Sequence, residues 1–549
     1  MSQRRSRFRS VVSLVNAKLS IKTAAIVLAS STLVSALLGI FRDRWLNSMY
    51  YDTYPAGLDA YTAAFTVPDF LFFIITSGAL AVTFIPVFNQ RLANGNKKSA
   101  WELSTSVLNF LALLCFIASV FIMIFADPLV RYIVAPGLNE SAMSLAINMM
   151  RVIAINPFLF SIATVLSSMQ QAVGRFVFYA IAPALYNVGI IIGILCFTNG
   201  INVFGIQLFE GGIMGVALGV VLGAIFQLVA SIIGLIGLGF DYNFKIYWKN
   251  QGFRTVLKLL PTRSADQGID YVMGIINTNL ASRMGEQSIR AYQQAASLHS
   301  MPVNLIGVAI STAFFPRLSE EIGTGDEEKF QKTFRSALDT IVWISMPVAI
   351  LSFFLRGYVV NFIKNGGDPK IASVLGAFLV AIFCQSVFHI LSRSFYARQN
   401  TKTPLIISII AFVVQIVFAI WFSVAGYGPE GLAHAASISA LAEILMLLFM
   451  QNRTMHHKLC NREFWSVFTR IVIASTITGV VSYVMTKLLP LRATDNSFLS
   501  TFPKFCVITI VSGIAYIVSC SLLKLEEVKP IIAKINSTLF RNNLSDNQK

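Results

Sequence analysis

Long apolar blocks alternate with short polar connections from about Thr23 to about Leu523. A helix that spans a membrane needs about 20 consecutive, mainly apolar residues. Blocks of that length recur about fourteen times along the chain. The expected helices cover residues 23–41, 59–90, 104–130, 145–172, 177–198, 212–239, 255–282, 290–317, 333–358, 370–396, 404–426, 429–451, 464–489 and 499–523. The pattern therefore predicts an all-α polytopic membrane protein.

Composition excludes two other classes of protein. Hydrophobic residues make up 55% of the chain, charged residues only 13%, and the mean hydropathy is +0.68. A soluble domain carries about 25% charged residues, and a disordered chain combines low hydrophobicity with high charge. The sequence also lacks a P-loop, a dinucleotide glycine motif, an H-E-x-x-H motif and a C-x-x-C pair. We therefore expect no enzyme, no catalytic residues, no cofactor and no metal site.

The positive charge predicts membrane orientation rather than nucleic-acid binding. The net charge is +17, but in a membrane protein the position of Lys and Arg matters more than their sum. Residues 1–22 are basic and are followed by no A-x-A cleavage site, which indicates a retained first helix with a cytoplasmic N-terminus. If successive loops alternate between the two sides of the membrane from a cytoplasmic N-terminus, most Lys and Arg fall in cytoplasmic loops. Fourteen helices then place both termini in the cytoplasm. The same charge attracts anionic membrane lipid.

The chain also repeats itself weakly. The echoed pairs are Gly78–Pro86 with Gly307–Pro316, Gly174-Arg175 with Ala397-Arg398, and Gly215-Val-Ala217 with Gly431-Leu-Ala433. Each half then holds about six helices, so the two halves share one orientation and are related by a pseudo-two-fold axis along the membrane normal. Such a repeat is typical of transporters that work by alternating access between two lobes.

The repeat divides the chain into five regions, and the last two helices fall outside it. The expected regions are a basic cytoplasmic N-terminus (1–22), an N-lobe (23–240), a C-lobe (241–455), a final helix pair (456–525) and a cytoplasmic tail (526–549). Prolines inside the spans, such as Pro68 and Pro157, are expected to kink their helices.

Ionisable residues at membrane depth are the candidate site. Such groups are costly in lipid and usually face a cavity or a partner. The candidates are Arg42 and Asp43 at the end of the first helix, Asp59 and Asp69 in the second, and Arg263, Asp266 and Asp270 on one face of the seventh. That face is either a cavity wall or an internal ion pair that joins two helices. For Arg151, Arg393, Glu443 and His299, packing roles are at least as plausible.

These residues stand in motifs that resemble those of the lipid II flippases of peptidoglycan synthesis, the MurJ/MviN family. The motifs are Leu38-Gly39-Ile-Phe-Arg42-Asp43, Asp59–Asp69, Gly78-Ala79, Phe84-Ile-Pro86, Ile276-Asn277-Thr278, Gly307-Val-Ala309, Pro316-Arg-Leu-Ser319 and Phe395–Pro404. Each is modest alone, but their order and spacing together are specific and cover nearly the whole chain.

The resemblance implies a fold, a substrate and a site. It implies a cavity between two lobes, lined mainly by helices 1, 2, 7 and 8, and a groove for a polyprenyl tail on the last two helices. The implied substrate is lipid II, an undecaprenyl-diphosphate-linked sugar-peptide, moved from the inner to the outer leaflet of the bacterial cytoplasmic membrane. Guanidinium groups suit a diphosphate because they can bind it with two hydrogen bonds. The substrate-binding set is Arg42, Asp43, Asp59, Asp69, Arg263, Asp266, Asp270 and Asn277, and cell-wall synthesis proteins become candidate partners.

Several positions depart from the family pattern and keep alternatives open. Charged positions of the family correspond here to Ala36, Phe72, Phe73, Ser77, Ala296 and Ser297. Fewer cations would then line the cavity. The alternatives are an exporter of another lipid-linked glycan or of drugs, and a degenerate homologue that transports nothing.

Overall fold

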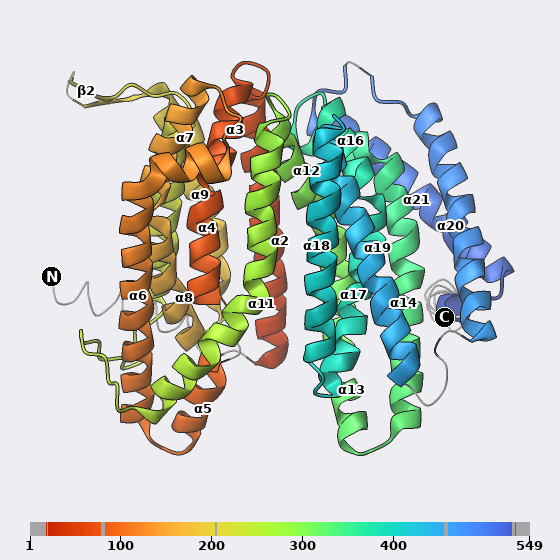
Figure 1. Ribbon diagram of the computed structural model, residues 1–549, viewed down its shortest axis with the longest axis horizontal. Helices are drawn as coiled ribbons and strands as arrows, with labels where there is room; N and C mark the ends of the chain where they lie inside the picture. Colours follow the sequence, from red (N-terminus) through yellow and green to blue (C-terminus); the bar gives the residue numbers. More distant parts are fainter. Residues whose placement is uncertain are drawn as a thin grey trace, which may run out of the picture. The chain divides into compact units, whose positions relative to one another are not determined.

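The computed structural model is almost entirely helical, and its contacts divide the chain into two compact units, Met1–Arg290 and Ala291–Lys549. It describes residues 18, 20–77, 83–203, 206–454, 459, 461–492, 494–529 and 533, while the side chains of 21, 22, 25, 77, 201, 203, 206, 208 and 261–267 lie outside that description. Figure 1 traces the elements along the chain.

The first unit contains ten α-helices in the described residues, several short helical turns and one hairpin. Its elements are α2 (Ile21–Tyr50), α3 (Pro55–Ala64), α4 (Thr66–Phe72), the π-helical turn η1 (Phe73–Ser77), α5 (Ile85–Ala93), α6 (Lys97–Pro128), η3 (Leu129–Val134), α7 (Glu140–Ile153), α8 (Asn156–Ala172), α9 (Val177–Cys196), η4 (Phe197–Asn199), β1 (Ile201–Val203), β2 (Ile206–Phe209), α10 (Met214–Ile233) and α11 (Gln251–Ser282). Strands β1 and β2 pair antiparallel, with Ile201 opposite Phe209. α11 packs against α4, η1 and η3, so by its contacts it belongs to this unit.

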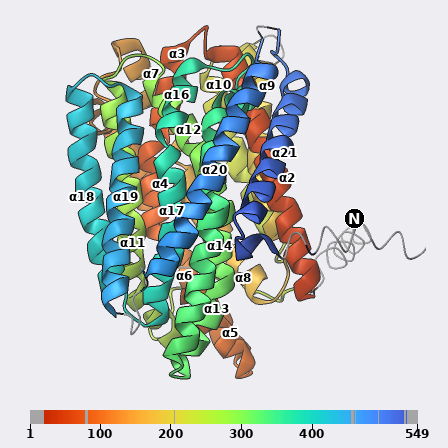
Figure 2. The ribbon, with the colours of Figure 1, turned by 90° about the vertical axis from the view of Figure 1, so that its right-hand side faces the viewer.

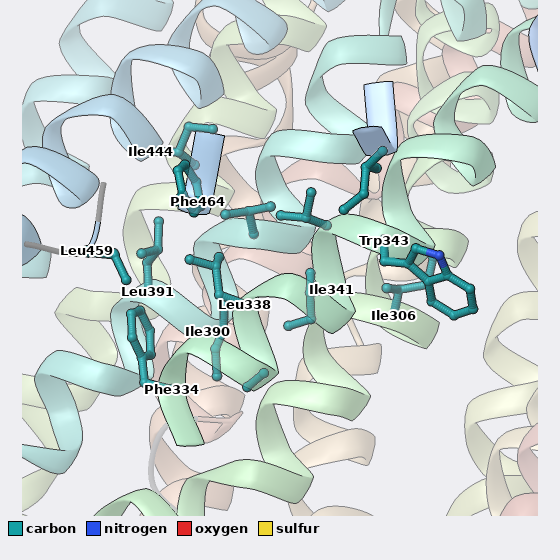
Figure 3. Packing of buried hydrophobic residues seen from close by; sticks show 14 of the residues in the cluster. Ile306, Phe334, Leu338, Ile341, Trp343, Ile390, Leu391, Ile444, Leu459 and Phe464 are labelled. Carbon is teal, nitrogen blue, oxygen red and sulfur yellow. The ribbon is translucent and has the colours of Figure 1, made fainter. Parts of the chain in front are cut away.

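The second unit begins within α12 and ends after α21. Its elements are α12 (Ser288–Val303), η5 (Asn304–Val308), α13 (Ala309–Gly323), α14 (Glu327–Phe354), α15 (Arg356–Ile363), α16 (Pro369–Ala377), α17 (Leu379–Ala397), α18 (Lys402–Val424), α19 (Pro429–Thr454), α20 (Arg462–Leu488), α21 (Phe498–Leu522) and η6 (Glu526–Val528). Its core joins α14, α17 and α20 through side chains such as Leu338, Ile341, Ile390 and Phe464 (Figure 3). α20 packs against both α21 and α14 (Figure 2).

Prolines break two of the predicted spans at a defined position. A proline cannot donate to the carbonyl oxygen four residues earlier. α3 ends at Ala64, four residues before Pro68, and α7 ends at Ile153, four residues before Pro157. The predicted spans 59–90 and 145–172 therefore each consist of successive shorter helices.

Glycines bring α9 and α10 into backbone contact. A Cβ added to Gly189 would lie 2.3 Å from the Cα of Gly223, and one added to Gly193 would lie 2.5 Å from the Cα of Gly219. Small residues four apart on facing helices allow this close approach in membranes, where packing rather than the hydrophobic effect drives association. The two helices form the tightest pair in the first unit.

The structure confirms a multi-pass membrane protein. Within the described residues, thirteen helical segments are long and apolar enough to span a membrane, and they coincide with thirteen of the predicted spans. The predicted seventh span, 255–282, coincides with α11. The count of fourteen spans and the arrangement of lobes related by a pseudo-two-fold axis stay predictions, as does the division of the chain at 240 and 455.

Candidate functional site

Arg42 and Asp43 lie near the end of α2 and form an ion pair. The distance from Arg42 Nη2 to Asp43 Oδ1 is 3.1 Å, and the Nε of Arg42 donates to the same oxygen over 3.3 Å. Arg42 Nη1 donates to Asn187 Oδ1 of α9 over 3.0 Å, and Asn187 Nδ2 donates back to the carbonyl oxygen of Ser35. The side chain of Arg42 is 26% exposed. The guanidinium is thus held on several sides and still reachable.

A second arginine, Arg290, shares the same carboxylate. It lies in the first turn of α12, and its side chain is only 5% exposed. Its Nη2 is 3.4 Å from Asp43 Oδ1, and its Nε and Nη2 donate to Asn47 Oδ1 over 3.1 and 2.9 Å. Two guanidiniums therefore converge on one carboxylate, which they partly neutralise together.

Asp59 completes this cluster from α3. It is 2% exposed, and its Oδ1 accepts the backbone N–H of Arg290 over 2.8 Å. A carboxylate at a helix N-terminus satisfies a free N–H and complements the helix dipole. The predicted residues Arg42, Asp43 and Asp59 are thus brought together, and we name Arg42, Asp43, Asn47, Asp59, Asn187 and Arg290 the α2 charge cluster.

The prediction missed Arg290, Asn47 and Asn187. Arg290 stood at the boundary of a predicted span, where a cation is usually assigned to the adjoining loop. One signal was available, because a cation in the first turn of a helix opposes the dipole and needs a carboxylate nearby. The two asparagines carry no charge and gave no signal among the many polar residues of the spans.

Asp69 lies apart from this cluster, on α4. It is half-buried, within electrostatic range of Tyr61, Tyr186 and Tyr271. Among the side chains that the structure describes, none forms a hydrogen bond or ion pair with Asp69. A carboxylate that no described cation contacts is an unusual group at membrane depth, where such groups mark polar sites.

α11 carries the remaining predicted residues. The side chains of Arg263 and Asp266 lie outside the described residues, so the predicted polar face is not tested. Asp270 is exposed and lies beside Tyr271, and Asn277 is buried at 5% exposure. Their assignment to a substrate site stays a prediction.

Phe72 and Phe73, where the resemblance to the family implied a basic pair, make aromatic contacts. Phe73 stacks on Tyr271 of α11 with ring centroids 4.4 Å apart, and Phe72 packs against Phe160 of α8 at 5.5 Å. α4 and η1 therefore meet α8 and α11 through rings rather than through charges.

Three further polar residues have packing roles in the second unit. His299 stacks on Phe378 with centroids 4.3 Å apart, and its Nε2 lies 2.9 Å from Gln385 Oε1. Arg393 lies over the ring of Phe315, and Glu443 Oε1 accepts a hydrogen bond from Ser408. Arg151, in the first unit, is exposed at the end of α7.

Arg42 is the more exposed of the two arginines in the α2 charge cluster, at 26% against 5%. A phosphate that approached Arg42 would compete with Asp43 for the guanidinium. Asp43 would keep Arg290 as a partner at 3.4 Å, so the exchange leaves no buried carboxylate without a cation. The cluster therefore suits a reversible anion contact.

Comparisons with known proteins identify the family. A family model described as "Lipid II flippase MurJ" matches residues 55–502. The chain is 26% identical over 437 residues to the probable lipid II flippase MurJ of Bdellovibrio bacteriovorus, covering 77% of this chain and 81% of that protein. It is 24% identical over 517 residues to the probable lipid II flippase MurJ of Thermotoga maritima, covering 92% and 97%.

Solved structures support the same fold. A lipid II flippase MurJ in an inward closed conformation aligns with a TM-score of 0.71 at 22% identity, covering 94% of this chain and all of that one. An inward-facing multidrug resistance MATE family transporter of the MOP superfamily aligns with a TM-score of 0.62 at 18% identity, covering 78% and 98%. These four relatives are all named as flippases or transporters. With a family match that spans most of its length, this chain belongs to the lipid II flippase MurJ family.

Proposed function

We propose that this protein is a flippase that moves lipid II from the inner to the outer leaflet of the bacterial cytoplasmic membrane by alternating access. The observation that carries the proposal is the match of residues 55–502 to the lipid II flippase MurJ family. Both termini are proposed to lie in the cytoplasm, because the loops on that side carry most of the Lys and Arg.

The chemistry of the substrate explains why polar groups at membrane depth are needed. A diphosphate with sugars loses its hydration in hydrocarbon, at a large free-energy cost unless new hydrogen bonds replace the water. We propose that Arg42 and Arg263 contact the diphosphate and that Asp43, Asp59, Asp69, Asp266, Asp270 and Asn277 set the polarity of the path. Asp43 is shared by Arg42 and Arg290, and this supports the proposed role. If Arg42 released Asp43, the carboxylate would still be paired with Arg290.

The polyprenyl tail is proposed to lie along α20 and α21. These two helices pack against each other and expose large apolar side chains, among them Val480 (60%) and Ile510 (60%). A tail on such a surface stays in an apolar medium throughout transport, so only the headgroup needs a polar path.

The primary test is rescue of cells depleted of their own lipid II flippase. The wild-type protein should restore growth, whereas Arg42→Ala and Arg263→Ala should abolish rescue at equal membrane abundance. The matched control is Arg283→Ala, because Arg283 is an exposed arginine outside the α2 charge cluster. Failure of the well-expressed wild type would refute the function. Full rescue by both variants would refute only the assignment of the arginines.

A second candidate is transport of another polyprenyl-linked glycan or of a drug. The observation in its favour is the aromatic contact of Phe73 with Tyr271, at a position where the family pattern is basic. Proteoliposomes that contain lipid II, another undecaprenyl-diphosphate-linked glycan or a cationic dye would separate these cases. A degenerate homologue would move none of the three.

A further inference from the structure

The linker between α10 and α11 is a fixed structure rather than a free loop. Near its start, Arg175 Nη1 donates to the carbonyl oxygen of Ile236 over 2.9 Å. Further along, Asn109 Nδ2 of α6 donates to the carbonyl oxygens of Asn243 and Lys245 over 2.8 and 3.1 Å.

The final residues of the linker are held in the same way. The backbone N–H of Tyr247 donates to Ser106 Oγ over 2.8 Å, and Asn250 Nδ2 donates to the carbonyl oxygen of Ser99 over 3.2 Å. By these contacts, successive residues of the linker follow α6 from Asn109 back toward its first turn. Figure 1 shows the linker beside the part of α6 that leads from α5.

The linker carries exposed aromatic and basic side chains, of which Tyr242 also donates to Asn109 Oδ1 and Trp248 also packs on Phe110 of α6. Phe244 is 90% exposed, Trp248 is 54% exposed and Tyr242 is 41% exposed. Lys245 and Lys249 are exposed beside them, as is Asp241. Aromatic rings and basic groups together are typical of segments that lie at the boundary between lipid headgroups and hydrocarbon.

The length of α6 agrees with a position of this linker at that boundary. α6 has 32 residues, so it is about 48 Å long at 1.5 Å per residue, against a hydrocarbon core of about 30 Å. Asn109 lies twelve residues after Lys97, the first residue of α6. It is therefore about 18 Å from that end of the helix.

A pocket of about 630 Å³ opens beside the aromatic residues. Its lining includes Arg91, Ser99, Glu102, Trp248 and Lys249. Arg91 Nη1 donates to Ser99 Oγ, while the buried Nε of Arg91 has no hydrogen-bond partner in the described part of the chain.

Positive charge exceeds negative charge around this pocket. Among the side chains that line the pocket, Arg91 and Lys249 are cationic and Glu102 is anionic. Arg254 Nε donates to the carbonyl oxygen of Trp248 over 2.8 Å, which ties a cation to the aromatic segment. An anion is the complementary ligand.

We propose that residues 240–250 form a membrane-interface anchor whose pocket binds the phosphate of an anionic phospholipid between Arg91 and Lys249. Phe244 and Trp248 enter the acyl boundary beside the bound headgroup. The exposed rings distinguish a lipid from a free phosphate, because a soluble anion would leave them in water. Since Asn250 caps the start of α11, a bound lipid also fixes the point where α11 begins.

The test measures apparent affinity for phosphatidylglycerol by native mass spectrometry of the full-length protein in detergent. Arg91→Gln and Lys249→Gln should each weaken binding about fivefold, since one basic residue near an anionic surface contributes about that factor. Lys245→Gln/Lys249→Gln changes only exposed side chains, so it tests the same charge without risk to folding. The matched control is Arg151→Gln/Arg283→Gln, which removes two exposed cations elsewhere in the first unit.

Two further measurements distinguish a phospholipid from free inorganic phosphate as the ligand. Phe244→Ser should also weaken phosphatidylglycerol binding, although it changes no charge. Inorganic phosphate should compete poorly, and phosphatidylcholine should bind more weakly than phosphatidylglycerol. Wild-type affinity in both pocket variants would overturn the proposal. So would competition by inorganic phosphate as effective as that by phosphatidylglycerol.

Discussion

Replacement of Arg290 by methionine is the sharpest perturbation of the α2 charge cluster. Methionine keeps a long apolar side chain but removes the guanidinium. The substitution deletes both hydrogen bonds to Asn47 Oδ1 and the ion pair with Asp43. It leaves the backbone N–H that Asp59 accepts. The change therefore isolates the side chain of Arg290 from the start of α12.

The magnitude follows from these contacts. A hydrogen bond between membrane helices contributes about 0.6–2 kcal/mol, and breaking a buried ion pair from one side costs about 3–5 kcal/mol. Asp43 retains Arg42, so the lower part of the second range applies. We expect Arg290→Met to reduce the free energy of unfolding by about 3 kcal/mol.

Denaturant unfolding in detergent provides the measurement, and a double-mutant cycle with Asn47→Ala tests the cause. The pair should show a coupling free energy of about 1–2 kcal/mol, because the two residues share two hydrogen bonds. Arg283→Met, at an exposed site, should change stability by less than about 0.5 kcal/mol. Additive effects of Arg290→Met and Asn47→Ala would refute the role given to the guanidinium.

Three other regions yield predictions. Gly219→Val should destabilise the fold by about 2–4 kcal/mol, because its side chain would meet the backbone of α9, and thermal unfolding measures this. Asn250→Ala should cost about 1–2 kcal/mol through loss of the cap of α11, measurable in the same assay. Hydrogen bonds from the Arg492 N–H and from Lys504 lower the pKa of Asp495 below its ordinary value of 3.8. Its carboxylate therefore stabilises the fold above that value and loses this effect as the pH falls through the lowered pKa. Asp495→Asn should reduce stability at pH 7 and make progressively less difference in acid.

Controls for these predictions lie in the same chain. Gly513→Ala should be neutral or stabilising by up to about 1 kcal/mol, because no atom lies within 4 Å of an added Cβ. A loss of stability as large as that of Gly219→Val would show that close contact does not explain the effect, because alanine has the higher helix propensity. A stability difference between Asp495→Asn and wild type that stays constant with pH would contradict the assigned titration.

The spans could be predicted because each depends on a local property. α6 and α18 are long apolar blocks. α18 begins and ends within two residues of its predicted span, whereas α6 begins at Lys97, seven residues before its predicted start. The breaks at Ala64 and Ile153 were also within reach, since Pro68 and Pro157 each remove the hydrogen bond to the carbonyl oxygen four residues before. The hairpin of β1 and β2 could not be predicted, because strands of three or four residues are too short to show an alternation of apolar and polar residues.

The site could be predicted only in part, because its partners come from distant positions. Arg42 and Asp43 stood out as charges at membrane depth. Asn187 and Arg290 contact them from 145 and 247 residues away. Nothing in the local pattern of a helix specifies which residue of another helix will face it. The polar amides in particular become recognisable only when the helices are placed side by side.

The glycine contacts of α9 and α10 have a mechanical consequence. The backbones of α9 and α10 touch at successive turns, so neither helix can slide or tilt against the other without a steric clash. The two helices therefore form a rigid pair. Asn187 lies on α9 of this pair, and its side-chain oxygen accepts a hydrogen bond from Arg42. Through this hydrogen bond, α2 is attached to a pair of helices that resist relative movement.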